Sequence, residues 1–400
     1  MNPFVSHFEC SLEGTLHEAG QVYRLSDAGR PMLVRYALDA IRGRVDRDEV
    51  AARSGGFWKW RELLPPGDPD GVPRLGEVDT PWIRLSSGQD LIVKDEGRLP
   101  TGSFKARGLA LAVAMAREFG IDRLCMPSNG NAGAALAAYA TRAGVRSLVY
   151  CPADTPRVNL DETRMYGAEV VEIDGYIDDC GRLLASRAAE EGWFDVSTLK
   201  EPYRLEGKKT MGLELAAQCD WQLPDAIFYP TGGGTGLIGM WKAFAELKAL
   251  GWIDCQLPKM YAVQAEGCAP MVRAWQAGAE FAERWDDAQT AAAGIRVPAA
   301  VGDFLILRTV RDSGGQAIAV SETEIDTAWR ELAIREGVMM CPEGAATFAA
   351  WRRLVDAGEL PADASAVLFN CATGLKYALP PSRGAEFESA FDPSDRRDTR

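Results

Sequence analysis

Histidine is scarce in this sequence. The 400 residues contain only His7 and His17, both close to the N-terminus. Histidine is the usual general base of hydrolytic triads and the commonest metal ligand. Its scarcity therefore argues against histidine-based hydrolysis and against histidine-rich metal sites along the rest of the chain. The chemistry must then come from lysine, carboxylates, hydroxyls, thiols or a bound cofactor.

Paired cysteines, long apolar runs and an excess of positive charge are also absent. The nine cysteines are scattered without Cys-x-x-Cys spacing, as is typical of reduced thiols in a cytoplasmic protein. No apolar run approaches the roughly 18 residues that span a bilayer, and the N-terminus has no apolar signal-peptide core. Acidic residues outnumber basic ones by 57 to 44, giving a net charge of −13. This balance disfavours nucleic acids and anionic membranes as partners.

What the sequence does contain is an alternation of short apolar runs and helical segments. The expected strands are residues 124–126, 147–151, 169–173, 226–229, 260–264, 305–310, 317–320 and 366–369. The expected helices are residues 41–66, 132–143, 157–166, 177–191, 208–218, 237–250, 322–336 and 345–357, and residues 80–82 and 91–94 are expected to form a hairpin. The alternation predicts an α/β protein with parallel-rich sheets flanked by helices, and the length favours two lobes.

Residues 101–108 (TGSFKARG) connect an apolar run to an alanine-rich helix. Gly102 and Ser103 have the character of a turn and an N-cap, so Lys105 falls in the first helical turn. The positive end of the helix dipole disfavours a cation there and lowers the pKa of an ammonium group. A lowered pKa is what a lysine needs to form a Schiff base. The alternative is a solvated surface lysine beside a helix cap.

Residues 230–236 (PTGGGTG) follow an expected strand and open a helix. Their glycines let backbone N–H groups converge at a helix N-terminus, which makes a phosphate-binding loop. The segment lacks the Gly-Lys-Ser/Thr of a nucleoside-triphosphate loop and the spacing of a dinucleotide fingerprint. The alternative is a tight strand-to-helix turn that binds nothing.

Two further residues lie where expected strands end. Asn131, in residues 128–133 (SNGNAG), either caps the following helix or reaches into a site at the carboxyl end of the strand. Cys371 follows the strand at residues 366–369, and on its own it is best read as a buried structural thiol.

These segments, in this order, resemble the fold-type-II pyridoxal-phosphate enzymes, and most closely the threonine synthase family. The matching segments are residues 101–108 (TGSFKARG), 128–131 (SNGN), 201–210 (EPYRLEGKKT), 230–236 (PTGGGTG), 342–346 (PEGAA) and 373–377 (TGLKY). No single segment is decisive, but together they span most of the chain. The resemblance implies a two-lobed fold with pyridoxal 5′-phosphate in the cleft between the lobes.

The resemblance also implies which residues bind the cofactor. Lys105 would hold it covalently and then move protons at Cα and beyond. Asn131 would hydrogen-bond its phenolic oxygen, and its 5′-phosphate would lie on Gly232, Gly233, Gly234, Thr235 and Gly236. Cys371 would face the pyridine nitrogen. A neutral thiol there leaves the nitrogen largely unprotonated, which favours elimination and replacement at Cβ or Cγ over transamination.

The substrate implied by the resemblance is a small amino acid, bound by Ser103, Ser128 and Arg204. Several positions depart from the family pattern: Ala132, Thr198 and Gly233 replace polar groups that help to hold a phosphate. Glu201 would repel such a group. The adjacent Lys208 and Lys209 could supply compensating charge, but as neighbours at a helix start they are expected to be solvated.

Many family members begin with a zinc ribbon that is degenerate here. Of the ligand positions only Cys10 remains, so residues 1–40 are expected to be ribbon-like and to bind no metal. Residues 101–200 should form the small lobe and residues 41–100 and 201–380 the large lobe. Residues 381–400, rich in Pro, Ser, Asp and Arg, are expected to be a disordered tail. A homodimer is the family expectation.

Three functions fit this sequence. The first is a threonine synthase, which converts O-phosphohomoserine and water to L-threonine and phosphate. The second is a threonine or serine dehydratase, or a β-replacement enzyme, and the lost phosphate ligands and Cys371 favour it. The third is a non-catalytic cofactor-binding protein.

Overall fold

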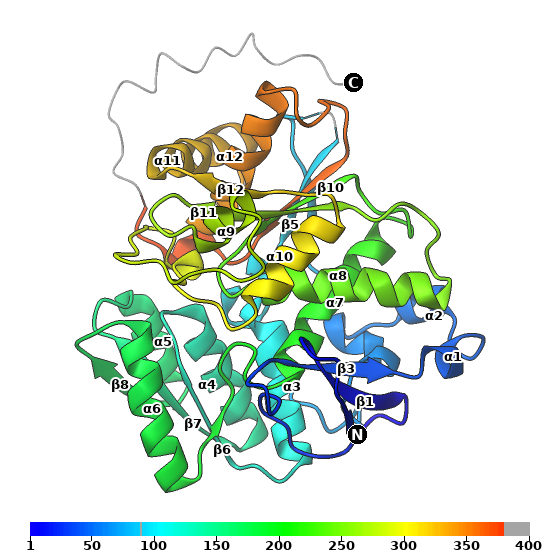
Figure 1. Cartoon of the computed structure of the whole chain (residues 1–400), viewed down its shortest axis with the longest axis vertical. Coiled ribbons are helices and arrows are strands. Elements are labelled where there is room, and N and C mark those ends of the chain that lie inside the picture. The colour runs from blue at the N-terminus through cyan, green and yellow to red at the C-terminus, as the bar shows by residue number, and fades with distance from the viewer. Residues whose placement is uncertain (89, 380–400) are drawn as a thin grey trace.

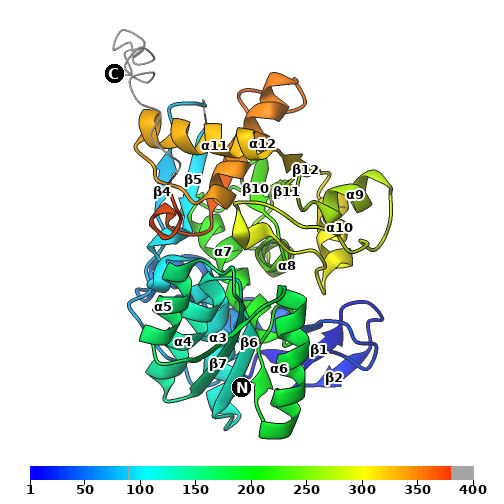
Figure 2. The same cartoon turned by 90° about the vertical axis from the view of Figure 1, so that its left-hand side faces the viewer.

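Three sheets organise the chain (Figure 1, Figure 2). The computed structural model describes residues 1–88 and 90–379, and the tail predicted at residues 381–400 lies outside them. The strands are β1 (Val5–Cys10), β2 (Leu16–Glu18), β3 (Met32–Tyr36), β4 (Trp82–Arg84), β5 (Leu91–Asp95), β6 (Arg123–Pro127), β7 (Arg146–Pro152), β8 (Glu169–Ile173), β9 (Phe194–Asp195), β10 (Ala226–Pro230), β11 (Lys259–Ala265), β12 (Ala317–Val320) and β13 (Ala366–Asn370). The helices are α1 (Leu38–Ile41), α2 (Arg47–Ala52), α3 (Lys105–Glu118), α4 (Asn131–Ala143), α5 (Arg157–Met165), α6 (Ile177–Glu191), α7 (Tyr203–Gln218), α8 (Thr235–Leu250), α9 (Pro270–Gln276), α10 (Asp303–Asp312), α11 (Glu322–Glu331) and α12 (Pro342–Asp356).

The six-stranded sheet has the order β12-β11-β10-β13-β5-β4. All its neighbours pair in parallel except β4, which forms the expected antiparallel hairpin with β5. Strand β10 is buried along its whole length, as is β13 beside it. Central parallel strands of this kind bring the loops at their carboxyl ends to one edge, where α/β enzymes place their sites.

The four-stranded sheet is wholly parallel, in the order β8-β7-β6-β9. Its strands lie between residues 123 and 195, and α4, α5 and α6 lie against it at one end of the molecule (Figure 1). Helices α11 and α12 lie at the other end, and α7 and α8 lie between the two groups in both views (Figure 2). The division into lobes at residues 101–200 agrees with this strand membership but stays a prediction.

The N-terminal residues form a small antiparallel sheet, β2-β1-β3. Cys10, the one remaining ribbon cysteine, is buried, and its sulfur lies 3.1 Å from the hydroxyl oxygen of Ser26. In the part of the chain that the structure describes, no helix is long and apolar enough to cross a membrane.

Two local predictions differ from the structure. Residues 305–310, expected as a strand, lie inside α10. Its buried side chains continue to Val310 while Arg308 and Arg311 are exposed, a helical spacing that a short apolar run does not reveal. Residues 41–66, expected as a helix, form α2 and a 3-10 turn at Gly56–Leu63, because Gly55 and Gly56 adopt positive φ angles of 111° and 56°.

Buried charges fix α3 and α7 against β5. The guanidinium of Arg107 donates to Glu96 at 2.6 Å and to Glu214 at 2.9 Å, and Lys94 pairs with Glu214 at 2.5 Å. All four side chains are almost fully buried. Although burial opposes its ionisation, Arg107 and Lys94 lower the pKa of Glu214 to about 2. Glu214 is therefore ionised beside its two cationic partners at neutral pH.

Removing the Glu214 charge is expected to destabilise the fold. In Glu214→Gln, two buried cations lose their shared carboxylate, so we expect the free energy of unfolding to fall by about 3–5 kcal/mol. Because the folded pKa of Glu214 is lowered, its contribution is complete above the unfolded value of 4.5 and is lost as the pH falls toward 2. Urea unfolding at several pH values measures both effects. The exposed-pair variant Asp161→Asn should change stability by about 0.5 kcal/mol or less; an equally small loss in Glu214→Gln would contradict the prediction.

Candidate functional site

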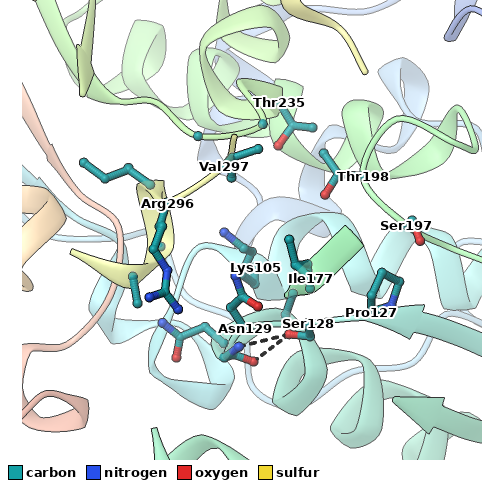
Figure 3. A pocket seen from close by; sticks show the side chains of 18 of the residues that line it. Lys105, Pro127, Ser128, Asn129, Ile177, Ser197, Thr198, Thr235, Arg296 and Val297 are labelled. Atoms are coloured by element: carbon teal, nitrogen blue, oxygen red, sulfur yellow. Dashed lines mark hydrogen bonds between the residues drawn. The ribbon is translucent and has the colours of Figure 1, made fainter. Parts of the chain in front are cut away.

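A cavity of about 550 Å³ lies at the carboxyl ends of the central strands of the two large sheets. Its wall is formed by Lys105, the loop between β6 and α4, the loop between β10 and α8, and Cys371 after β13. Residues 293–301, which we call the rim loop, form another side. Figure 3 shows Lys105, Thr198, Thr235 and Arg296 arranged around this space. The cavity thus brings together segments that are far apart in the sequence.

Lys105 is the first residue of α3, as predicted, and its side chain lines the cavity. Its ammonium nitrogen lies 3.9 Å from the centroid of the Phe104 ring. Burial, together with the nearby Arg204, lowers the pKa of Lys105 to about 8. The alternative of a solvated surface lysine is therefore wrong, and the amine exchanges protons readily near neutral pH.

Helices α3 and α7 cross in backbone contact beside Lys105. A Cβ atom on Gly108 would lie 3.0 Å from the carbonyl oxygen of Arg204, and one on Gly207 would lie 2.7 Å from the Cα atom of Gly108. Real Cβ atoms do not approach other atoms as closely as 2.7 Å, so Gly207 must be glycine, and a side chain at Gly108 would force the two helices slightly apart. The crossing places Arg204 on the helix next to that of Lys105.

The prediction that Lys208 and Lys209 are solvated is wrong. Lys208 donates to the carbonyl oxygen of Phe104, and burial, with Lys105 and Arg204 nearby, lowers its pKa well below the usual value. Lys209 pairs with Glu206 at 2.7 Å and with Glu246 at 2.9 Å. Neither lysine lines the cavity. The prediction failed because α7 begins at Tyr203 rather than at residue 208, so both lysines fall inside the helix and are buried.

The glycine loop at residues 230–236 opens α8 and has no room for side chains. A Cβ atom on Gly232 would lie 2.8 Å from Val297, and one on Gly233 would lie 2.8 Å from Thr198. Gly234 adopts a φ of 72° as the N-cap, and Thr235 begins the helix. Backbone N–H groups at this helix N-terminus therefore border the cavity without a side chain over them, which suits a phosphate. The site fits a cofactor that ends in a phosphate group.

Asn131 begins α4 and does not cap it. Its amide nitrogen lies 3.4 Å from the hydroxyl of Tyr377, and its buried amide oxygen has no partner among the described residues. Ser128, labelled in Figure 3, organises this turn instead, because Gly130 and Gly133 donate their N–H groups to its hydroxyl at 3.1 and 2.9 Å. The capping alternative for Asn131 is wrong, and the side chain is free to bind a ligand in the cavity.

Cys371 precedes Ala372, which pairs with Ser103 in an isolated antiparallel bridge. Burial raises the pKa of Cys371 to about 12, so its thiol stays neutral at the cavity wall. The carbonyl of Cys371 accepts from the N–H of Phe104 at 2.9 Å. Ser103 is fully buried with its hydroxyl unpartnered among the described residues, and it does not line the cavity.

Arg204 lines the cavity with only 2% of its surface exposed. It donates to the carbonyl of Val196 at 2.7 Å, its Nε has no partner, and no described carboxylate forms an ion pair with it. The carboxylate of Glu201 instead accepts from the N–H groups of Tyr203 and Arg204, at 2.7 and 3.1 Å, and burial raises its pKa to about 7. Glu201 does not line the cavity, but its carboxylate interacts electrostatically with Arg204, so the expectation that it repels a phosphate there stays a prediction.

Sequence reasoning gave no role to three cavity residues. Glu343, at the start of α12, accepts from the N–H of Gly294 at 2.6 Å and so holds the rim loop. Tyr377 lies beside Asn131, and Arg296 extends from the rim loop into the cavity wall. Glu343 and Tyr377 fall in segments that carry the family resemblance, whereas Arg296 follows no motif that we singled out.

Comparisons with known proteins agree with this geometry. The sequence profile of the family described as pyridoxal-phosphate dependent enzyme matches residues 74–372. The chain belongs to this family. It is a pyridoxal-phosphate-dependent lyase of fold type II, not a non-catalytic binding protein, and the residues around the cavity fit the cofactor.

Among curated proteins, the chain is 32% identical over 374 residues to a threonine synthase of Methanocaldococcus jannaschii, covering 92% of each sequence. It is 35% identical over 373 residues to a threonine synthase of Methanosarcina acetivorans, covering 92% of the chain and 91% of that protein. Among solved structures, the threonine deaminase of T.th. matches with a TM-score of 0.64 and 27% identity, covering 76% of the chain and 94% of the other. The processed threonine deaminase isoform 2 of Solanum lycopersicum has a TM-score of 0.64 at 18% identity, covering 78% of the chain and 82% of the other, which shows the shared fold alone.

Proposed function

We propose that the protein acts as a threonine synthase, converting O-phosphohomoserine and water to L-threonine and inorganic phosphate. The observation that carries this proposal is Arg204, a nearly buried cation in the cavity wall without a carboxylate partner among the described residues. Such a guanidinium is suited to a phosphate that arrives with the substrate. The similarity to enzymes named threonine synthase over 92% of the chain supports the same reaction.

Residues of this chain can be assigned to the proton transfers and to the departing phosphate. When bound, pyridoxal phosphate supplies the electron sink that stabilises negative charge at Cα of the substrate. Lys105, with its pKa lowered to about 8 by burial, would remove protons from Cα and Cβ in turn and return protons to Cγ and Cα, while water adds at Cβ. Arg204 holds the phosphate as its bond to Cγ breaks. We assign cofactor binding to Lys105, Asn131, Gly232, Gly233, Gly234, Thr235, Gly236 and Cys371, and substrate binding to Ser128 and Arg204, with Ser103 supporting them from behind the wall.

Neutralising Arg204 is expected to impair use of the phosphorylated substrate. A hydrogen bond to a charged group contributes about 1.5–3 kcal/mol, so Arg204→Gln should raise KM for O-phosphohomoserine by about 10- to 100-fold. KM for L-serine, which carries no phosphate, should change by less than about threefold. Phosphate release measures turnover of O-phosphohomoserine, and 2-oxo acid formation measures turnover of L-serine. Arg204→Lys, which keeps the charge but not the planar fork, should fall between them; an unchanged KM in both variants would contradict the role.

A second function has its own support. Ala132 and Gly233 leave parts of the cavity wall without the hydroxyl groups that would help to hold a phosphate. The neutral Cys371 thiol and the 27% identity to a threonine deaminase structure point the same way. On this alternative, the holoenzyme would release 2-oxo acid from L-threonine or L-serine and no phosphate from O-phosphohomoserine.

We also propose a cytoplasmic homodimer in which residues 101–200 close over the substrate as a small lobe. None of the cysteines is in a disulfide, as suits a reducing compartment. Two exposed apolar side chains, Met165 (88% exposed) and Leu375 (77%), lie on segments joined by the Lys376–Glu162 ion pair and are candidates for a subunit contact. Light scattering of the holoenzyme tests the dimer.

A further inference from the structure

Arg296 is a cation in the cavity wall whose ion pair with a solvent-exposed carboxylate is weak. It lies in the rim loop, lines the cavity, and donates to the carboxylate of Asp154 at 3.0 Å. Asp154 belongs to the segment between β7 and α5 and does not line the cavity, so the ion pair joins the rim loop to that segment. Figure 3 shows Arg296 pointing from the rim loop toward the loop that carries Asn129.

The two members of this pair differ in their access to water. The Arg296 side chain is 25% exposed, whereas that of Asp154 is 61% exposed. An exposed ion pair contributes little to stability, because water stabilises the free carboxylate almost as well as the guanidinium partner does. A substrate oxyanion inside the cavity would meet Arg296 in a drier place, where the attraction is stronger. Exchange of Asp154 for a substrate oxyanion is therefore favourable.

The other cavity cations are less suited to such an exchange. Lys200 pairs with Asp195 at 3.0 Å, and that carboxylate is only 19% exposed and also accepts from Ser197. Arg182 is 78% exposed and pairs with Asp179 on its own helix. Arg296 thus combines a wall position with a partner that is easily released.

We propose that Arg296 is a substrate-binding residue that exchanges its ion pair with Asp154 for an oxyanion of the bound amino acid. This inference rests on the proposed amino-acid lyase function. The oxyanion has two sources, the distal phosphate of O-phosphohomoserine or the α-carboxylate that every amino acid carries. A cation that holds either group selects anionic ligands and is released again when the product leaves.

A simple clasp between the two sides of the cavity would have the same geometry, and the two roles predict opposite effects. If Asp154 competes with the substrate, Asp154→Asn should tighten ligand binding by about two- to fivefold, while Arg296→Gln should weaken it by about tenfold or more. If the pair only clasps the cavity, both variants should weaken binding alike. A matched control is Arg284→Gln, which breaks the Arg284–Asp178 pair at 2.5 Å although Arg284 does not line the cavity.

The experiment titrates the three variant holoenzymes with L-threonine and L-serine, following the cofactor absorbance, and measures KM for O-phosphohomoserine and inhibition by inorganic phosphate. Weakening confined to the two phosphate ligands identifies the distal phosphate, and equal weakening for all amino acids identifies the α-carboxylate. Arg296→Gln that behaves like wild type or like Arg284→Gln overturns the inference, as does weaker binding in Asp154→Asn. The L-threonine titration needs no turnover. A wild-type enzyme that releases no phosphate, but whose L-threonine binding still responds oppositely to the two variants, would refute the synthase proposal and leave this one standing.

Discussion

Lys105→Ala is expected to lower kcat by about a thousandfold or more and to leave the cofactor bound without a covalent link. On the proposed mechanism, the variant removes both the amine that would hold the cofactor and the group that would move protons at Cα and Cβ. Borohydride reduction followed by mass spectrometry of tryptic peptides measures the link directly. The wild-type enzyme should carry the reduced cofactor on the peptide that contains residue 105, and the variant should carry none.

The control for this prediction is the neighbouring lysine. Lys105 and Lys208 both place their nitrogen 3.9 Å from the centroid of the Phe104 ring, and burial lowers the pKa of both. Lys208 does not line the cavity, so Lys208→Met should keep the covalent link even if its stability falls. A link lost in Lys208→Met and kept in Lys105→Ala would show that the two lysines have been assigned the wrong way round.

Gly233→Asp is expected to abolish stable cofactor binding. The new side chain would start 2.8 Å from Thr198 and would place a carboxylate against the cofactor phosphate at the start of α8. After dialysis, we expect the variant to retain less than about a tenth of the wild-type cofactor absorbance, with unchanged circular dichroism.

Gly233→Ala separates the steric effect from the electrostatic effect, because it introduces the contact with Thr198 but not the negative charge. We expect it to weaken cofactor binding by about tenfold and Gly233→Asp by about a hundredfold or more. Full occupancy in Gly233→Asp would mean that the phosphate is bound elsewhere.

The sequence predicts those parts of this protein that depend on short segments of the chain. The parallel strands around β10, the glycine loop before α8 and the position of Lys105 at the start of α3 all follow from short segments and their flanking residues. The strand predicted at residues 305–310 is wrong because a short apolar run suits a helix of the core as well as a strand.

The rest of the site depends on contacts between distant segments. Glu201 turns its carboxylate to the N–H groups of its own helix start, and Lys209 meets carboxylates on both α7 and α8. The rim loop reaches the cavity because Glu343, from α12, binds the N–H of Gly294. Such partners are many residues away in the chain, so residue type and spacing alone do not reveal them.

The crossing of α3 and α7 has a consequence for which amino acids can react. Gly108 and Gly207 let the two helices touch, so Lys105 and Arg204 stand on one rigid unit. With the roles proposed for Lys105 and Arg204, the distance between the proton at Cα and the departing phosphate would be set before any substrate enters. We then expect amino acids with one methylene more or fewer to present their leaving group at the wrong distance, so that a pair of glycines outside the cavity would select the length of the substrate's carbon chain.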